Sequence, residues 1–147
     1  MNSKTLYFED VDLGDEIGPV ERIITDEQVI EFVKLREIEF ESGPSRFTSK
    51  EVAISQGLTE AIVPGAMNIA LMSQLLTGWA ENVCLLKIDV VFRKTVPHNT
   101  TLIFNGIVTG KNDDSGNNEL ECDITMQLQD GVKMVIGNSV ISLPNRL

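Results

Sequence analysis

The chain has 147 residues with 22 acidic and 12 basic side chains, which gives a formal net charge of −10. This length predicts one domain, residues 1–147, that buries its own core without a disulfide or a metal. The acidic balance and the lack of a basic cluster argue against nucleic acid as a partner, because phosphate neutralisation supplies most of that affinity.

The first quarter of the chain predicts an extended lead-in, a short strand and a helix. Residues 5–15 read as the lead-in and residues 17–24 as the strand. A helix is expected from Asp26 to about Glu39, because Thr25 and Gln28 have the spacing of a capping box.

A loop and a second short helix follow. Gly43-Pro44-Ser45 breaks the first helix. The Thr48/Glu51 spacing predicts a new helix start, and Gly57 suits the left-handed residue that ends a helix. We therefore expect a helix of about two turns between these positions.

The next segment predicts a central helix that begins near Pro64 and Gly65. Ten of the fifteen residues in 66–80 are apolar and none is charged, a pattern typical of a helix covered on nearly all sides. A membrane span is not expected, because fifteen helical residues reach only about 22 Å against a hydrocarbon core of about 30 Å. The N-terminus shows no signal-peptide pattern, so we expect a cytoplasmic protein.

After Trp79 the pattern alternates with a period of two residues, which predicts strands with one buried face. On the first of these strands Leu86, Ile88, Val90 and Phe92 are expected to be buried. The four expected strands cover residues 86–92, 102–108, 120–128 and 132–143, with turns at 112–117 and 130–131. Strands in sequence joined by turns favour an antiparallel meander. The expected fold class is α+β, with a curled antiparallel sheet wrapped around the long central helix.

Cys84 and Cys122 lie in apolar, strand-like runs without zinc-ligand spacing. Both are predicted to be buried reduced thiols, and no metal is expected.

The order and spacing of several short motifs resemble the MaoC-like branch of the hotdog-fold proteins, which includes (R)-specific enoyl-CoA hydratases. The motifs that carry the resemblance are Phe8-Glu9-Asp10-Val11-Asp12-Leu13-Gly14-Asp15-Glu16, Gln56-Gly57-Leu58, Ile62-Val63-Pro64-Gly65-Ala66-Met67, Val91-Phe92-Arg93-Lys94-Thr95-Val96, and Gly131 with Gly137 and Leu143-Pro144. The resemblance implies a hotdog fold over nearly the whole chain. It also implies at least a dimer, in which two sheets join around a two-fold axis.

The same resemblance implies an active site that this chain has only in part. The hydratases carry an aspartate and, five residues later, a histidine as the acid–base pair, but alignment places Ser42 and Phe47 at these positions. Pro64 replaces a histidine that the family has before the glycine of the helix start. Gly65 is retained, and its backbone amide is expected to polarise a thioester carbonyl at the N-terminus of the helix.

Three other side chains are candidate acid–base groups because of their type and their position in the sequence. Glu39 and Glu41 flank the position of the missing aspartate and are candidate displaced carboxylates, although a solvated surface position explains them as well. His98, the single histidine, is a candidate base, although a turn between two strands predicts an exposed residue.

Substrate contacts are expected from the backbone at Pro64, Gly65 and Ala66. Arg46 and Arg93, with Lys94, are candidates for the phosphates of coenzyme A. No separate cofactor is expected, because coenzyme A or a carrier phosphopantetheine enters as part of the substrate.

Three functions remain open from the sequence. One is a MaoC-like hydratase or dehydratase acting on acyl thioesters with a non-standard acid–base group. Another is a non-catalytic acyl-thioester binding subunit, or the inactive half of a heteromeric hydratase with a partner that carries the acid–base pair. The third is a hotdog thioesterase, for which Glu60 is the acid near the helix start.

Overall fold

The computed structural model describes residues 4–36 and 43–147, so Glu39, Glu41 and Ser42 lie outside the described residues. The elements in chain order are the 3-10 helix η1 (Phe8–Asp10), β1 (Glu16–Ile23), α1 (Asp26–Arg36), α2 (Lys50–Ser55), α3 (Gly65–Thr77), β2 (Cys84–Phe92), β3 (Thr101–Asn112), the 3-10 helix η3 (Asp114–Gly116), β4 (Glu119–Leu128) and β5 (Lys133–Ser142).

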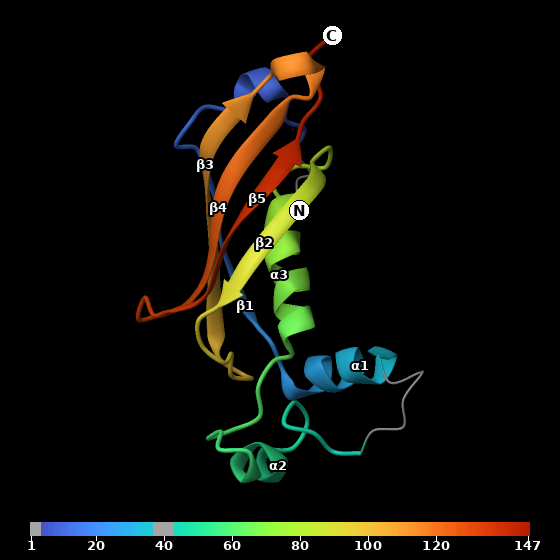
Figure 1. Ribbon diagram of the computed structural model, residues 1–147, viewed down its shortest axis with the longest axis vertical. Helices are drawn as coiled ribbons and strands as arrows, with labels where there is room; N and C mark the ends of the chain where they lie inside the picture. The colour runs from blue at the N-terminus through green and yellow to red at the C-terminus, as the bar shows by residue number, and fades with distance from the viewer. Residues whose placement is uncertain (1–3, 37–42) are drawn as a thin grey trace.

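The strands form one antiparallel five-stranded sheet in the order β1-β3-β4-β5-β2. Helix α3 runs along the sheet and contacts β1, β2, β3 and β4 (Figure 1). Helices α1 and α2 lie beyond the end of the sheet, at the end of the molecule where α3 begins (Figure 1). The first turn of α3 therefore lies near these two helices, with Phe92 at the end of β2 beside Gly65.

The predicted central helix is confirmed, and its apolar residues form one side of the core. Leu71, Met72, Leu75 and Leu76 of α3 are buried, and they belong to the same core cluster as Phe104 and other residues of the sheet. The prediction that α3 is covered on nearly all sides is wrong for the single chain. Ala66, Ile69 and Ala70 are exposed because the sheet covers only one side of the helix.

The predicted four-strand meander is wrong in the placement of β2. Strands β3, β4 and β5 do follow one another, but β2 pairs with β5 at the far edge instead of with β3. Gly137 of β5 permits this pairing, because a Cβ there would lie 2.2 Å from the carbonyl oxygen of Asp89 on β2. A glycine inside a strand marks such a close approach of two backbones.

The edge position of β2 also corrects three predicted burials. Leu86 is 51% exposed, since the pairing with β5 shifts register between Leu85 and Lys87. Phe92 is 49% exposed at the end of the strand. Cys84 is exposed, contrary to prediction, because it begins this edge strand.

Cys122, on the interior strand β4, is a buried free thiol as predicted. Burial raises the pKa of the Cys122 thiol to about 11.

Local turn chemistry agrees closely with the sequence. Thr25 and Gln28 exchange side-chain to backbone hydrogen bonds at the start of α1, as a capping box requires. The cap of α2 is Ser49, one residue after the predicted Thr48, and its hydroxyl accepts from the N–H of Val52. Gly57 has a positive φ of 87° just after α2, which confirms the predicted helix end.

No helix in the described ranges has both the length and the apolar character that crossing a membrane requires. The described residues also contain no group of His, Cys, Asp and Glu side chains arranged to hold a metal ion.

Candidate functional site

The N-terminus of α3 presents backbone donors that no side chain caps. Gly65 is the first helical residue, and the N-cap residue Pro64 makes no side-chain hydrogen bond to the helix. The N–H of Asn68 donates to the carbonyl oxygen of Pro64 at 3.0 Å, so the intrahelical bonds begin only there. The first turn contains no acidic residue, and the positive end of the helix dipole is left without a neutralising carboxylate.

Gly65 opens onto a cleft of about 320 Å³ at this helix end. Two backbone hydrogen bonds assemble its walls: the N–H of Val63 donates to the carbonyl of Val96 at 2.8 Å, and the N–H of Ile62 donates to the carbonyl of Arg46 at 3.1 Å. The residues that line the cleft are Arg46, Phe47, Ile62, Val63, Gly65, Asn68, Phe92, Arg93, Lys94, Thr95 and Val96.

The charges in this cleft are opposite in sign to those of the chain as a whole. Arg46, Arg93 and Lys94 line it, and none of its described lining residues is acidic, although the chain carries a net charge of −10. None of the three cations forms an ion pair with a described residue. At physiological salt, charges more than about 8 Å apart are largely screened, so this local excess of cations governs what the cleft attracts.

Contacts within the chain hold the segments that carry these cations. The N–H groups of Arg93 and Lys94 both donate to the carbonyl of Met134 on β5, at 2.8 and 3.1 Å. The guanidinium of Arg46 lies 5.0 Å from the ring centroid of Phe47, a cation–π distance. The backbone of Arg93 and Lys94 and the side chain of Arg46 are thus held by contacts within the chain.

The structure brings Gly65, Arg46, Phe47 and Arg93 of the predicted site together, whereas Pro64 and Ala66 do not line the cleft. Phe47, at the position of the family histidine, is half-buried and contributes an apolar ring. Apart from its cations, the described lining contains no titratable side chain. The described residues of one chain therefore supply no general acid or base near neutral pH at Gly65.

His98 lies elsewhere, and the prediction of an exposed residue is wrong. It is only 9% exposed because the N–H of the neighbouring Asn99 donates to the carbonyl of Ile24 at 2.7 Å and holds this turn against the start of α1. Its Nδ1 lies 2.8 Å from Oδ1 of Asp26, and this hydrogen bond holds the pKa of the Asp26 carboxyl below its usual value. His98 lines a different cavity of about 390 Å³, which it shares with Asp26 and Glu60.

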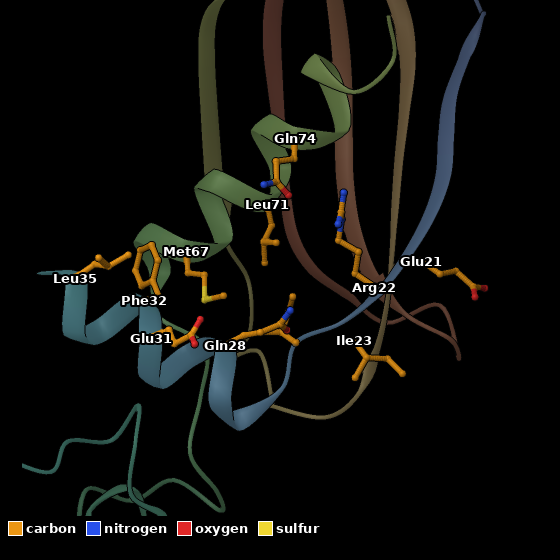
Figure 2. Close-up of a pocket in the computed structure, with 11 residues that line it drawn as sticks. Glu21, Arg22, Ile23, Gln28, Glu31, Phe32, Leu35, Met67, Leu71 and Gln74 are labelled. Atoms are coloured by element: carbon orange, nitrogen blue, oxygen red, sulfur yellow. The ribbon is translucent and has the colours of Figure 1, made fainter. Parts of the chain in front are cut away.

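A third and larger cavity of about 600 Å³ lies between α1, β1 and α3. Figure 2 shows Phe32 of α1 and Met67 of α3 at the same gap, with Arg22 of β1 extending toward α3. Unlike the Gly65 cleft, it has the acids Glu21 and Glu31 in its lining. Its mixed charges favour an anionic ligand less than the cation-lined cleft does.

Asn68 is the site residue that the sequence did not assign to the site. From the sequence, Asn68 and Gln74 are unusual polar residues in an uncharged helix and need hydrogen-bond partners, and packing or dimer contacts explain them as well as a substrate does. The structure places Asn68 in the Gly65 cleft with its Oδ1 buried and unpartnered by any described residue.

No protein-family model matches the chain, and no curated protein sequence matches it either. Several solved structures, however, are similar to it. The (R)-hydratase from A. caviae is 20% identical with a TM-score of 0.80, over 92% of this chain and 99% of that one. The MaoC-like dehydratase from Rhodospirillum rubrum is 15% identical with a TM-score of 0.77, over 97% of this chain and 99% of that one.

The ChsH1-ChsH2 complex from Mycobacterium tuberculosis also matches, with 15% identity and a TM-score of 0.76 over 90% of this chain and 98% of that one. The resemblance seen in the sequence motifs is thereby confirmed at the level of architecture. The chain has the hotdog fold of the MaoC-like dehydratases and (R)-hydratases.

Proposed function

We propose that this protein binds an acyl thioester in the Gly65 cleft, with the thioester carbonyl oxygen on the N–H of Gly65. The observation that carries the proposal is the uncapped N-terminus of α3 inside a cleft lined by three cations and, among the described residues, no acid. A helix N-terminus favours a carbonyl oxygen that gains negative charge, because its N–H groups already point at the ligand.

The phosphates of coenzyme A, or of a carrier phosphopantetheine, lie against Arg46, Arg93 and Lys94 in this proposal. Arginine binds phosphate through paired N–H donors and lysine as a point charge. The chain as a whole carries a net charge of −10, so the cation-lined cleft is the part of the described surface that supports binding of an anionic phosphate.

Hydration or dehydration is the less supported activity. Water addition to an enoyl thioester needs one group to take a proton and another to give one, and the described lining of the cleft offers neither near neutral pH. A non-standard acid–base group would have to come from Glu39 or Glu41, outside the described residues, or from a partner chain. The thioesterase alternative is weaker still, since Glu60 lines the His98 cavity instead of the Gly65 cleft.

A binding subunit of a hetero-oligomer is the second candidate function. The similar structures include two heteromeric assemblies from Mycobacterium tuberculosis, the ChsH1-ChsH2 complex and the HadBC (3R)-hydroxyacyl-ACP dehydratase complex. In such an assembly the present chain would hold or shape the thioester site, and its partner would supply the acid–base pair.

Titration calorimetry with butyryl-CoA tests the proposal. We expect binding that weakens as salt is raised, and an affinity about tenfold lower in Arg93→Gln, which loses a charged hydrogen bond. Lys87→Gln is the matched control, because it removes one charge from the exposed face of β2 outside the cleft. No binding by the unmodified protein, or equal losses in both variants, would contradict the proposal.

An assay of crotonyl-CoA hydration distinguishes a catalytically active hydratase from a binding subunit. Crotonyl-CoA incubated with the pure protein should keep its enoyl absorbance at the background rate, while an (R)-hydratase tested in parallel removes it. Rapid loss of absorbance would contradict the binding-subunit function and direct the search for a base to Glu39, Glu41 and a partner chain.

A further inference from the structure

His98 is a buried side chain outside the Gly65 cleft that the proposed function does not use. The residue is 9% exposed, and its Nδ1 lies 2.8 Å from Oδ1 of Asp26, the first residue of α1. The side-chain amide of Asn99 donates to the same oxygen at 3.1 Å, and the backbone N–H of Asn99 donates to the carbonyl of Ile24 at 2.7 Å. Three hydrogen bonds thus join this turn to the start of α1.

The same turn follows the segment that carries two cations of the cleft. Residues 93–96 line the cleft and belong to no helix or strand, so no regular ladder of hydrogen bonds fixes their course. At one end the N–H groups of Arg93 and Lys94 donate to a carbonyl on β5, and in the middle the carbonyl of Val96 accepts from the N–H of Val63. The other end is the turn that is bonded to α1. The position of the cationic segment therefore depends on this turn.

Asn99 gives the turn a conformation that its surroundings must maintain. Its φ is 56°, in the left-handed region that a residue with a Cβ seldom adopts. Such a conformation persists where neighbouring contacts determine it, and here those contacts include the bonds to Asp26 and Ile24. Without the bond from His98, the turn has fewer contacts with α1 and the segment before it gains freedom.

We infer that His98 is a positioning residue, whose hydrogen bond to Asp26 holds residues 93–96 with their two cations facing the phosphates of a bound thioester. This inference rests on the proposed binding of a thioester in the Gly65 cleft, with its phosphates on Arg93 and Lys94. His98 itself does not touch the ligand, because it lines the separate cavity beside α1. It acts through the loop, since a segment that is already ordered loses less conformational entropy when the phosphates bind.

Two ligands that differ in their phosphates separate a positioning role from a purely structural one. Butyryl-CoA carries phosphates for the cations, whereas butyryl-pantetheine has the same thioester and no phosphate. Calorimetric titration should show that His98→Leu binds butyryl-CoA about threefold more weakly than the unmodified protein does, a loss within the range of one net hydrogen bond. Its affinity for butyryl-pantetheine should be unchanged. A general disturbance of the fold would instead weaken the binding of both ligands.

Two further variants test the hydrogen bond itself. His98→Asn should restore the affinity for butyryl-CoA, because the amide nitrogen of asparagine is bonded to Cγ, as Nδ1 of histidine is, and can donate to Asp26. Asp26→Ala removes the acceptor from a side chain that is 60% exposed, and it should show the same loss of about threefold. Removal of an acid by itself would favour phosphate binding, so this loss has the opposite sign to a simple charge effect.

Ile30→Val is the matched control. Ile30 lines the same cavity as His98 and lies outside the Gly65 cleft, so this variant disturbs the cavity and keeps the hydrogen bond. Its affinity for both ligands should equal that of the unmodified protein.

The outcomes distinguish this inference from the proposed function. Unchanged affinity for butyryl-CoA in both His98→Leu and Asp26→Ala would overturn the positioning role and leave thioester binding at Gly65 standing. Equal losses for the two ligands would overturn that role as well. Failure of the unmodified protein to bind butyryl-CoA would overturn the proposed function, and this inference with it.

Discussion

The ring of Phe92, at the end of β2, packs against Gly65 at the start of α3, 3.3 Å from the position that a Cβ on residue 65 would occupy. This contact joins the edge strand of the sheet to the helix N-terminus where the thioester carbonyl is proposed to bind. A methyl group at position 65 would push the ring by a few tenths of an ångström and would itself take up space beside the Gly65 N–H, where the carbonyl is proposed to bind.

Gly65→Ala should therefore lower the affinity for butyryl-CoA about tenfold and change the free energy of unfolding by less than about 1 kcal/mol. Phe92 is half exposed, so its ring can move without disrupting the core. Gly43→Ala is the matched control, because a Cβ there meets no atom within 4 Å. Calorimetry and urea unfolding of both variants decide the matter, and an unchanged affinity in Gly65→Ala would argue against the site.

Asn68→Leu should stabilise the ligand-free protein. Removing an unpaired buried carboxamide in favour of an apolar side chain of similar size recovers about 1–3 kcal/mol of unfolding free energy. Urea denaturation measures the change. A destabilised variant would contradict this expectation, because it would mean that the Asn68 carboxamide has a structural hydrogen-bond partner.

The sequence predicted local features, such as helix caps, better than it predicted which strands pair in the sheet. The Thr25/Gln28 cap and the left-handed Gly57 depend on residues close in the chain, and both are confirmed. The alternation in β2 predicts a strand and gives no information on its neighbour. Its pairing with β5 depends on contacts about 50 residues apart along the chain, for which Gly137 was the available signal.

The candidate site was predicted where one element defines it. The helix-start motif placed Gly65 correctly, and residues 91–96 supplied the neighbouring cations. His98 was mispredicted as exposed, because its burial comes from α1, an element 72 residues away in sequence. Asn68 could be recognised as unusual from the sequence, but only the structure shows that its oxygen has no described partner.

The pair of Asp26 and His98 predicts a pH dependence of stability. The folded-state pKa of Asp26 is lowered by the His98 hydrogen bond, so the unfolded chain binds a proton first as the pH falls. The contribution is present above the unfolded carboxyl pKa, about 3.9, and disappears as the pH falls through the lower folded value. Asp26→Asn should therefore be less stable than the unmodified protein at pH 5, and the difference should shrink as the pH is lowered toward 2.

The difference should stay below about 1 kcal/mol, because the Asp26 side chain is 60% exposed and solvent screens the interaction. Glu27→Gln removes a charge from the same helical turn without touching His98 and serves as the control. Urea unfolding at the two pH values measures both variants. A difference in unfolding free energy between Asp26→Asn and the unmodified protein that stays constant down to pH 2 would contradict the role of the Asp26–His98 hydrogen bond.

The edge strand β2 predicts an oligomer. Val91 is 54% exposed and Leu86 51% exposed on a strand whose outer edge is unpaired in the described chain, and such edges invite pairing. Sedimentation should give at least twice the chain mass of 16.2 kDa at micromolar concentration. Val91→Lys should shift the protein toward monomer, and a stable monomer of the unmodified protein would contradict the prediction.

The amide resonance of Gly65 tests the central claim most directly. In ¹H–¹⁵N spectra, butyryl-CoA should move this resonance downfield as the thioester carbonyl accepts a hydrogen bond from the Gly65 N–H. Free coenzyme A has the same phosphates and no carbonyl on its sulfur, so it should perturb Arg93 and Lys94 and leave Gly65 in place. A Gly65 resonance that saturating butyryl-CoA does not move, or that both ligands move alike, would contradict thioester binding at this helix.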